Sequence, residues 1–204
     1  MRIIWLLVSF GFLLIAMSVH EFAHGLMAYK LGDNTAKYSG RLTLNPLAHI
    51  DLVGTILLPI FLFISTGGRF IFGAAKPVPI DSWNFKNPRR DIMLVGLSGP
   101  LANFIFAAFL SILFRMVNQG SITGIFLENL IVINVVLGAF NLIPIPPLDG
   151  SRVLMGILPQ QIAYKYSLIE PYGFFIILAL VGLGLINIWP VVQAILAFLM
   201  GNSA

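Results

Sequence analysis

The sequence contains no cysteine and few charged residues for its length. Of its 204 residues, 10% are Asp, Glu, Lys or Arg, whereas 58% are hydrophobic. The absence of cysteine excludes disulfides and every thiolate metal site, so a bound metal would need His, Asp or Glu ligands. A composition so poor in charge and so rich in apolar residues suits a lipid bilayer better than water. The sequence therefore predicts an all-α polytopic membrane protein.

The chain also has no Ser/Gly-rich linker and too few polar residues for a second, water-soluble domain. We therefore expect residues 1–204 to form a single membrane-embedded domain. The formal net charge of +4 is small and is spread over the segments between apolar runs. This distribution is typical of the positive-inside pattern of membrane proteins, and we expect no nucleic-acid partner.

Four apolar runs are long enough, or nearly so, to cross about 30 Å of hydrocarbon as helices. They cover residues 3–28, 92–114, 122–143 and 172–188. A shorter run at 52–64 contains Pro59 and suits a re-entrant or partial crossing at least as well as a full one. The last apolar region is interrupted at Trp189-Pro190, so residues 191–200 could be a further span, an interfacial helix or a kinked continuation. The pattern predicts about five to six transmembrane or re-entrant helices.

The first apolar run ends in the most informative motif of the sequence, His20-Glu21-Phe22-Ala23-His24. The run is longer than the apolar part of a signal peptide and lacks a small-residue cleavage site, so we expect it to be retained. On a helix, residues four apart share a face, and both imidazoles could reach one Zn²⁺ ion. Zinc lowers the pKa of a bound water to about 7, and Glu21 could take its proton. Because charged groups inside membrane helices are costly, a functional motif is favoured over a chance match.

A catalytic zinc site usually has three protein ligands, so the two histidines need a partner. The extended motif with a third histidine on the same helix is absent, because Met27 and Lys30 stand at its positions. The remaining candidates are His49, Asp33, Asp51, Asp81, Asp91, Glu128, Asp149 and Glu170. Asp149 is the most prominent, because it follows an apolar span and a proline-rich turn that would leave backbone carbonyls free. Its alternative role is to cap the helix that follows.

Together these motifs resemble the site-2 protease family of intramembrane zinc metalloproteases, peptidase family M50. That family pairs an H-E-x-x-H helix with a later helix ending in an N-x-x-P-x-x-x-L-D-G pattern, which residues 141–150 match. The resemblance implies one zinc ion bound by His20, His24 and Asp149, a catalytic acid/base at Glu21, and a role for Asn141 in binding the substrate carbonyl.

Segments between the motifs resemble the compact, mostly prokaryotic branch of the family, which has no PDZ or CBS-type domain. They are residues 40–51, 75–79 and 99–103, and the likeness extends from about residue 15 to residue 155. The resemblance implies a zinc-dependent metalloendopeptidase that hydrolyses peptide bonds in or near transmembrane segments. A helix hides its own carbonyls, so a substrate must unwind locally before attack. The expected partners are transmembrane protein substrates and the lipid bilayer, and a homo-oligomer is one candidate assembly.

Two rival interpretations belong to other classes of function. Intramembrane His and acidic residues also mark ion pathways, so the chain could be a membrane metal transporter. A pathway needs polar residues along several helices, however, and here they gather at one depth. A pseudoprotease that binds transmembrane clients without cutting them is the other alternative, against which the intact set of ligands and Glu21 argues.

A shared zinc also constrains the topology. The first helix and the helix at 122–143 must then end on the same side of the membrane. Ten of the twelve basic residues lie on that side, and Arg2 and Arg115 lie on the other. The ten are Lys30, Lys37, Arg41, Arg69, Lys76, Lys86, Arg89, Arg90, Arg152 and Lys165. The positive-inside rule therefore predicts a multi-pass protein of the cell membrane, with its N-terminus outside and its active site near the cytoplasmic side.

Three further features carry weaker signals. His49 and Asp51 could orient a ligand imidazole, or could simply belong to a polar loop. Residues 35–44 alternate loosely, which is consistent with a short β segment to which an extended substrate could add, or with an irregular loop. Gly99 and Asn103 favour close helix packing and an interhelical hydrogen bond, and a structural role is preferred for them.

Overall fold

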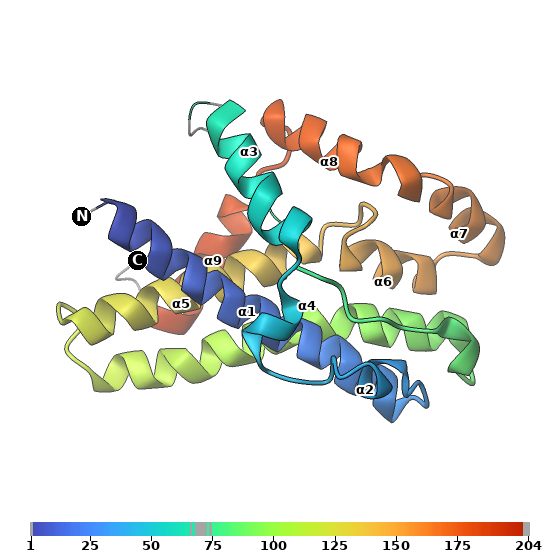
Figure 1. Cartoon of the computed structure of the whole chain (residues 1–204), viewed down its shortest axis with the longest axis horizontal. Coiled ribbons are helices and arrows are strands. Elements are labelled where there is room, and N and C mark those ends of the chain that lie inside the picture. The colour runs from blue at the N-terminus through green and yellow to red at the C-terminus, as the bar shows by residue number, and fades with distance from the viewer. Residues whose placement is uncertain (1, 66, 68–72, 74, 202–204) are drawn as a thin grey trace.

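The computed structural model describes residues 2–65, 67, 73 and 75–201, and among these residues there are helices and irregular segments but no strand (Figure 1). In chain order the elements are α1 (Arg2–Lys30), α2 (Thr35–Tyr38), η1 (Pro46–His49), η2 (Leu52–Leu57), α3 (Leu58–Ser65), η3 (Ser82–Asn84), α4 (Pro88–Met116), α5 (Ile122–Asn141), α6 (Asp149–Ile157), α7 (Gln160–Ser167), η4 (Glu170–Tyr172), α8 (Gly173–Gly182) and α9 (Trp189–Met200).

Four stretches of the described chain are long and apolar enough to cross a membrane. They are Ile4–Lys30, Pro88–Met116, Ile122–Asn141 and Gln160–Gly182. Two shorter apolar helices, Leu52–Ser65 and Trp189–Met200, accompany them. The predicted all-α polytopic fold is therefore confirmed.

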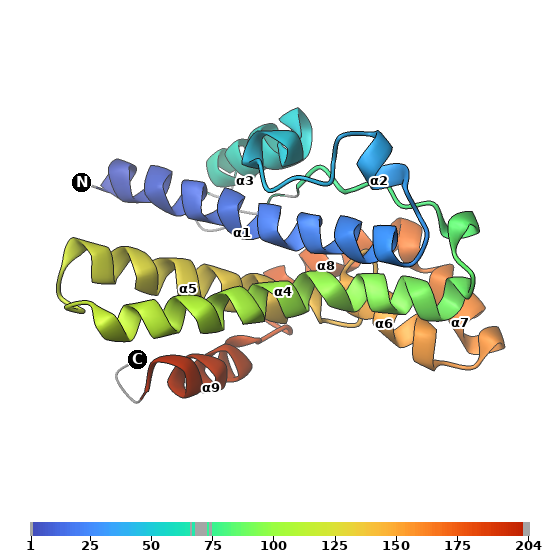
Figure 2. The same cartoon turned by 90° about the horizontal axis from the view of Figure 1, so that it is seen from below.

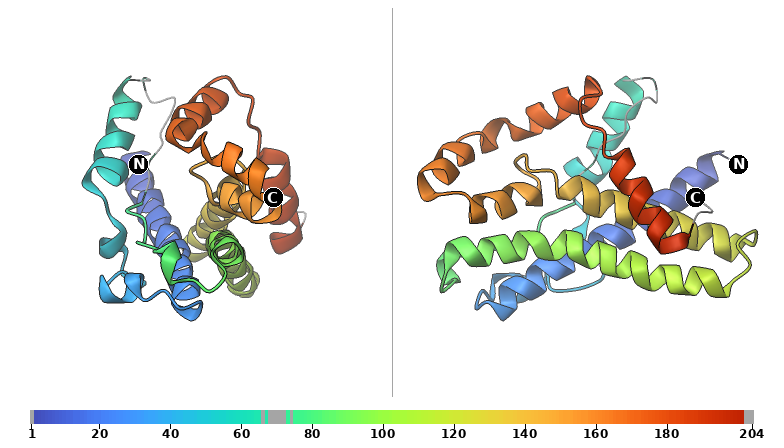
Figure 3. Two further views of the ribbon diagram at one scale, coloured as in Figure 1. Left: turned by 90° about the vertical axis from the view of Figure 1, so that its right-hand side faces the viewer. Right: turned by 180° about the vertical axis from the view of Figure 1, so that it is seen from behind.

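The three longest helices form the centre of the molecule. α4 lies beside both α1 and α5 and runs antiparallel to them, so α1 and α5 point in the same direction (Figure 2). α9 covers α4 and α5 on the side away from α1, where Val192 and Leu196 join Ile131 and Val135 in a buried apolar cluster. α3 and the α7–α8 pair lie away from this centre (Figure 3).

Local sequence signals explain where the central helices begin. Ser121 caps α5, because its hydroxyl accepts a hydrogen bond from the N–H of Gly124 at 3.1 Å. α4 begins with Pro88, whose missing N–H costs nothing in the first turn. The same tolerance applies to Pro190, which stands in the first turn of α9 and begins that helix instead of breaking a longer one. With 12 residues, α9 is about 18 Å long and too short for a full span.

The apolar span predicted at residues 172–188 is present, but both of its predicted bounds were wrong. The helix α8 ends at Gly182, since Gly184 adopts a positive φ of 68° and Leu185 donates back to the carbonyl of Leu180. A left-handed glycine with such a backward bond is a common helix stop. The apolar stretch instead extends backwards through η4 and α7, to Gln160.

Of the two alternatives for residues 35–44, the structure has the irregular segment and not the short β segment. Thr35 to Tyr38 form the helical turn α2, and the rest of the segment is turn or irregular. The cause is Asp33, whose Oδ1 accepts hydrogen bonds from both the N–H and the hydroxyl of Thr35. An aspartate that bonds the backbone two residues ahead stabilises a turn over an extended strand. Gly40, at a φ of 68°, then reverses the chain.

Candidate metal centre

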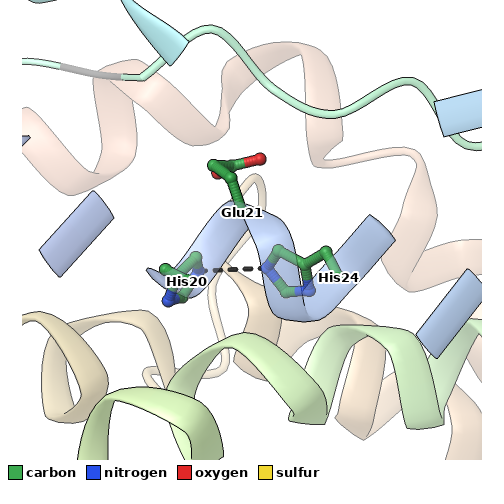
Figure 4. A group of neighbouring side chains, drawn as sticks. All are labelled: His20, Glu21 and His24. Carbon is green, nitrogen blue, oxygen red and sulfur yellow. Dashed lines mark hydrogen bonds between the residues drawn. The ribbon is translucent and has the colours of Figure 1, made fainter. Parts of the chain in front are cut away.

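α1 presents the two histidines of the sequence motif side by side. His20 and His24 are each 5% exposed, and their Nε2 atoms are 3.0 Å apart (Figure 4). The helical spacing of four residues places both imidazoles on the face of α1 that turns towards α4. α1 runs unbroken from Arg2 to Lys30, so both histidines are carried by one continuous helix.

Asp149 joins the histidines from the start of α6. Its Oδ2 lies 2.9 Å from Nε2 of His20 and 3.1 Å from Nε2 of His24. The alternative role of a helix cap is not seen, because this carboxylate faces the imidazoles and the capping position is occupied by Leu148 without a side-chain bond. Gly150 permits the approach, since a Cβ there would collide with the carbonyl of Leu142 at the end of α5.

The other nitrogen of each imidazole is held by a hydrogen bond that fixes the tautomer. Nδ1 of His24 lies 2.7 Å from the carbonyl oxygen of Val95, which can only accept, so His24 donates. Nδ1 of His20 lies 2.6 Å from Oδ1 of Asn103. The Asn103 amide nitrogen donates to the carbonyl of Ala16 at 3.0 Å and to Oδ1 of Asn134 at 2.8 Å, so its oxygen is the end that faces His20. An imidazole that is neutral in this arrangement therefore carries its proton on Nδ1 and leaves Nε2 as an acceptor.

This pattern directs three unprotonated acceptors at one point. Two Nε2 lone pairs and one carboxylate oxygen lie within 3.1 Å of one another. Such atoms repel unless a cation lies among them. Ligands of a tetrahedral zinc, at about 2.0–2.1 Å from the ion, stand about 3.3 Å apart, so the observed triangle fits zinc with little adjustment. Donation of Nδ1–H to a carbonyl or amide oxygen is also the usual support of a zinc-binding imidazole.

α4 contributes two residues for which the sequence favoured a structural role, close helix packing by Gly99 and an interhelical hydrogen bond by Asn103. Asn103 orients the imidazole of His20 directly and is itself fully buried. Gly99 lies against the two imidazoles, because a Cβ there would stand 2.5 Å from Nε2 of His24 and 2.7 Å from Nε2 of His20. An asparagine within an apolar span, three residues after the Gly99-Pro100 pair, was the available signal for this role.

Glu21 leaves α1 on a different face from the histidines (Figure 4). One of its carboxylate oxygens and one nitrogen of each imidazole nevertheless lie within 4.8 Å of one another. Its Oε2 accepts a hydrogen bond of 2.9 Å from the N–H of Val78. The carboxylate is therefore beside the three-atom triangle without being part of it.

The remaining candidates lie elsewhere. Nε2 of His49 bonds the carbonyl of Thr43 at 2.9 Å, and Asp51 caps η2, so the described hydrogen bonds connect neither residue to the imidazoles. Asn141 ends α5, and its amide nitrogen donates to the carbonyl of Leu137 at 3.0 Å. Asp33 holds the turn after α1. Burial alone would raise the pKa of Asp33, but hydrogen bonds from Thr35 and from residues 81 and 84 outweigh burial and lower that pKa.

Comparison with known proteins identifies the class of molecule that carries this site. YwhC of Bacillus subtilis, whose name assigns it provisionally to the zinc metalloproteases, is 40% identical over 193 residues, covering 89% of this chain and 84% of YwhC. Rip2 of Mycolicibacterium smegmatis, with the same provisional assignment, is 32% identical over 191 residues, covering 91% of this chain and 70% of Rip2. The zinc metalloprotease MJ0392 of Methanocaldococcus jannaschii is 28% identical over 160 residues, which are 78% of this chain and 37% of MJ0392. No solved structure matched the chain significantly.

The similarity to these relatives shows that the chain is a zinc-dependent metalloprotease. Its structure adds several apolar helices of the kind found in membranes. The family model of peptidase family M50 matches residues 115–180, which include all of α5, α6 and α7. The chain belongs to peptidase family M50. Zinc is accordingly its metal cofactor, as the resemblance of the motifs implied.

Proposed function

We propose that the chain cleaves peptide bonds in or near transmembrane segments of other membrane proteins, with one zinc ion held by His20, His24 and Asp149. The observation that carries the proposal is the triangle of two Nε2 atoms and Oδ2 within 3.1 Å. The triangle is buried between α1 and α4, two helices that are apolar and long enough to cross a bilayer. A site in that position would act on segments that share the membrane.

The zinc ion would lower the pKa of a water ligand to about 7 and polarise the substrate carbonyl. The chain's own residues would do the rest. Glu21 takes the proton of the attacking water on its carboxylate and passes it to the leaving amine, as a general base and then a general acid. Asn103 and the Val95 carbonyl hold the two imidazoles in the tautomer that keeps Nε2 free. Asn141 is proposed, from the family resemblance, to bind the substrate carbonyl, for which its amide must turn away from Leu137.

The substrate must supply a peptide bond that is not hidden in a helix. A transmembrane helix satisfies its own backbone hydrogen bonds, so its carbonyls are protected until the helix unwinds locally. We therefore expect substrates with helix-breaking residues, such as Gly or Pro, near the cleaved bond.

We propose that the active site faces the cytoplasm and that the N-terminus lies outside. His20 is 18 residues beyond the start of α1 at Arg2, or about 27 Å along a helix axis, which is near the far end of a bilayer span. The turns at the ends of α1 and α5 then share the side with most basic residues. Of those residues, Arg69 lies outside the described part of the chain. We further propose that residues 1–204 form one domain in the cell membrane, with a homo-oligomer as a possible assembly.

The test is cleavage of a model transmembrane substrate by purified protein in detergent. Glu21→Gln should keep near-stoichiometric zinc and lose cleavage by on the order of 10²- to 10⁴-fold, the usual contribution of a general base. Cleavage by Glu21→Gln at the wild-type rate would refute the mechanism. If the wild type binds the substrate but does not cut it, the chain is a client-binding pseudoprotease. Zinc transport into proteoliposomes without cleavage would identify a transporter.

A further inference from the structure

An extended segment, residues 76–81, crosses α1 beside the carboxylate of Glu21. The N–H of Val78, at its centre, donates to Oε2 of Glu21 at 2.9 Å. Val78 is buried and stands between Pro77 and Pro79. Because proline has no N–H, Val78 supplies the only backbone donor among these three residues. The contact is thus specific to one amide of the segment.

Both ends of the segment are fixed by hydrogen bonds. Lys76 donates its N–H to the carbonyl of His49 at 2.9 Å. Asp81 donates its N–H to Oδ2 of Asp33 at 2.8 Å, and Oδ1 of Asp33 accepts from the amide of Asn84 at 2.8 Å. Asp33 is fully buried, whereas Asp81 and Asn84 are exposed, so these bonds are partly shielded from competition by water. The Val78 N–H is therefore held between two anchors only five residues apart in sequence.

The segment is also stiff and closely packed on α1. Each proline fixes its φ near about −65°, which removes most of the freedom of the chain on either side of Val78. Gly25 lies one helical turn after Glu21 on the same face of α1. A Cβ on Gly25 would stand 3.3 Å from Cγ1 of Val78 and 3.3 Å from Cδ1 of Leu42, so the glycine gives the segment just enough space.

We propose that residues 76–81 form a positioning strut for Glu21. The Val78 N–H donates to Oε2 of Glu21 and so fixes the rotation of the carboxylate. Oε1 of Glu21 is then left to exchange a proton with the attacking water. Asp33 and the His49 carbonyl affect Glu21 only indirectly, because they hold residues 76–81 in place. The inference rests on the proposed role of Glu21 as general base. Val78 is in this account a positioning residue, since it does not touch the reacting atoms.

The first test compares two substitutions at Val78. Val78→Pro removes the N–H and should lower kcat on the order of 10- to 100-fold, as expected when a catalytic group is misplaced by about 1 Å. Val78→Ala trims the side chain but keeps the N–H, and its kcat should exceed that of Val78→Pro at least about tenfold. KM and zinc content should match the wild type in both variants, and the visible spectrum of the cobalt-substituted protein should be unchanged. Equal kcat in the two variants would overturn the proposal.

The second test measures the contact without any substrate. Among residues 76–80 only Lys76, Val78 and Ile80 have an exchangeable amide, because the other two are prolines. Glu21→Ala should speed hydrogen exchange at Val78, whereas Lys76 should keep the protection given by the His49 carbonyl. Unchanged protection at Val78 would show that Glu21 does not accept its hydrogen bond.

The third test changes Asp33, which holds one end of residues 76–81. It tests the proposal even if Val78→Pro fails to fold. Asp33→Asn replaces one acceptor oxygen with an amide and should lower kcat several-fold at constant KM and zinc content. Asp51→Asn is the matched control. Within the described part of the chain Asp51 caps η2 and makes no hydrogen bond to residues 76–81, so this substitution should leave kcat unchanged. A wild-type kcat in Asp33→Asn would overturn the strut. If Glu21→Gln itself cleaves normally, the proposed function fails, and that outcome differs from a strut that fails while Glu21 remains essential.

Discussion

Replacing Gly99 with alanine places a methyl group against both imidazoles of the candidate metal centre. The new Cβ would stand 2.5 Å from Nε2 of His24, 2.6 Å from its Cε1 and 2.7 Å from Nε2 of His20. Carbon atoms in good contact are about 3.5–4.0 Å apart, so about 1 Å of separation is missing. Either α4 moves away from α1 or the imidazoles rotate.

Both relaxations disturb the site, and their cost can be estimated. Overpacking a tight contact costs about 1–3 kcal/mol of stability. Moving α4 lengthens the bonds from His24 to the Val95 carbonyl and from His20 to Asn103, and loss of such supports usually lowers metal affinity about 10- to 100-fold. We therefore expect Gly99→Ala to lower zinc affinity by this factor and cleavage by at least as much.

The assay is zinc competition against a chromophoric chelator, run beside cleavage of the model substrate. Gly11→Ala is the matched control, because Gly11 also lies in a long helix and a Cβ there meets nothing within 4 Å. It should bind zinc and cleave as the wild type does. If Gly99→Ala behaves like Gly11→Ala, then α4 does not pack against the zinc ligands as described, and the reasoning is refuted.

Three further predictions follow from single contacts. Asn103→Ala should weaken zinc binding about 10- to 100-fold in the same competition assay, because His20 loses the acceptor that holds its tautomer. Gly150→Ala should reduce zinc content, since its Cβ would push the start of α6 and Asp149 away from Leu142, whereas Gly182→Ala, with nothing within 4 Å, should not. The pKa of Asp33 is lower in the folded protein than in the unfolded chain, where it is about 3.9. The ionised Asp33 carboxylate therefore stabilises the folded state fully above about pH 3.9. This stabilisation is lost as the pH falls through the folded-state pKa. The difference in Tm between the wild type and Asp33→Asn should therefore be largest near pH 6 and shrink below about pH 4; a difference that grows on acidification would contradict it.

The long helices and the motif on α1 were predictable from the sequence, because long apolar runs and the spacing of the two histidines both indicate helices. An apolar run sufficient to span a bilayer leaves a helix as the favoured backbone structure, and a spacing of four then places His20 and His24 on one face. The approach of Asp149 is a tertiary contact across 125 residues or more, and the sequence indicated it through the resemblance of residues 141–150 to a family pattern.

The features that were missed depend on contacts that no local pattern encodes. Residues 35–44 have the composition of a strand, but Asp33 stabilises a turn there. The end of α8 depends on the backbone conformation of Gly184. Asn103 could be expected to bond another helix, but its partner on α1 became evident only when α1 and α4 were packed together. The contact between Val78 and Glu21 has the same origin, since it joins residues 57 positions apart.

The central claim is that His20, His24 and Asp149 together hold one zinc ion. The most direct measurement is zinc content with X-ray absorption at the zinc edge, on the purified wild type and on Asp149→Ala. We expect one zinc per wild-type chain, bound by two imidazoles and oxygen at about 2.0–2.1 Å, and a large loss of zinc in Asp149→Ala. Full zinc content and an unchanged spectrum in Asp149→Ala would contradict it.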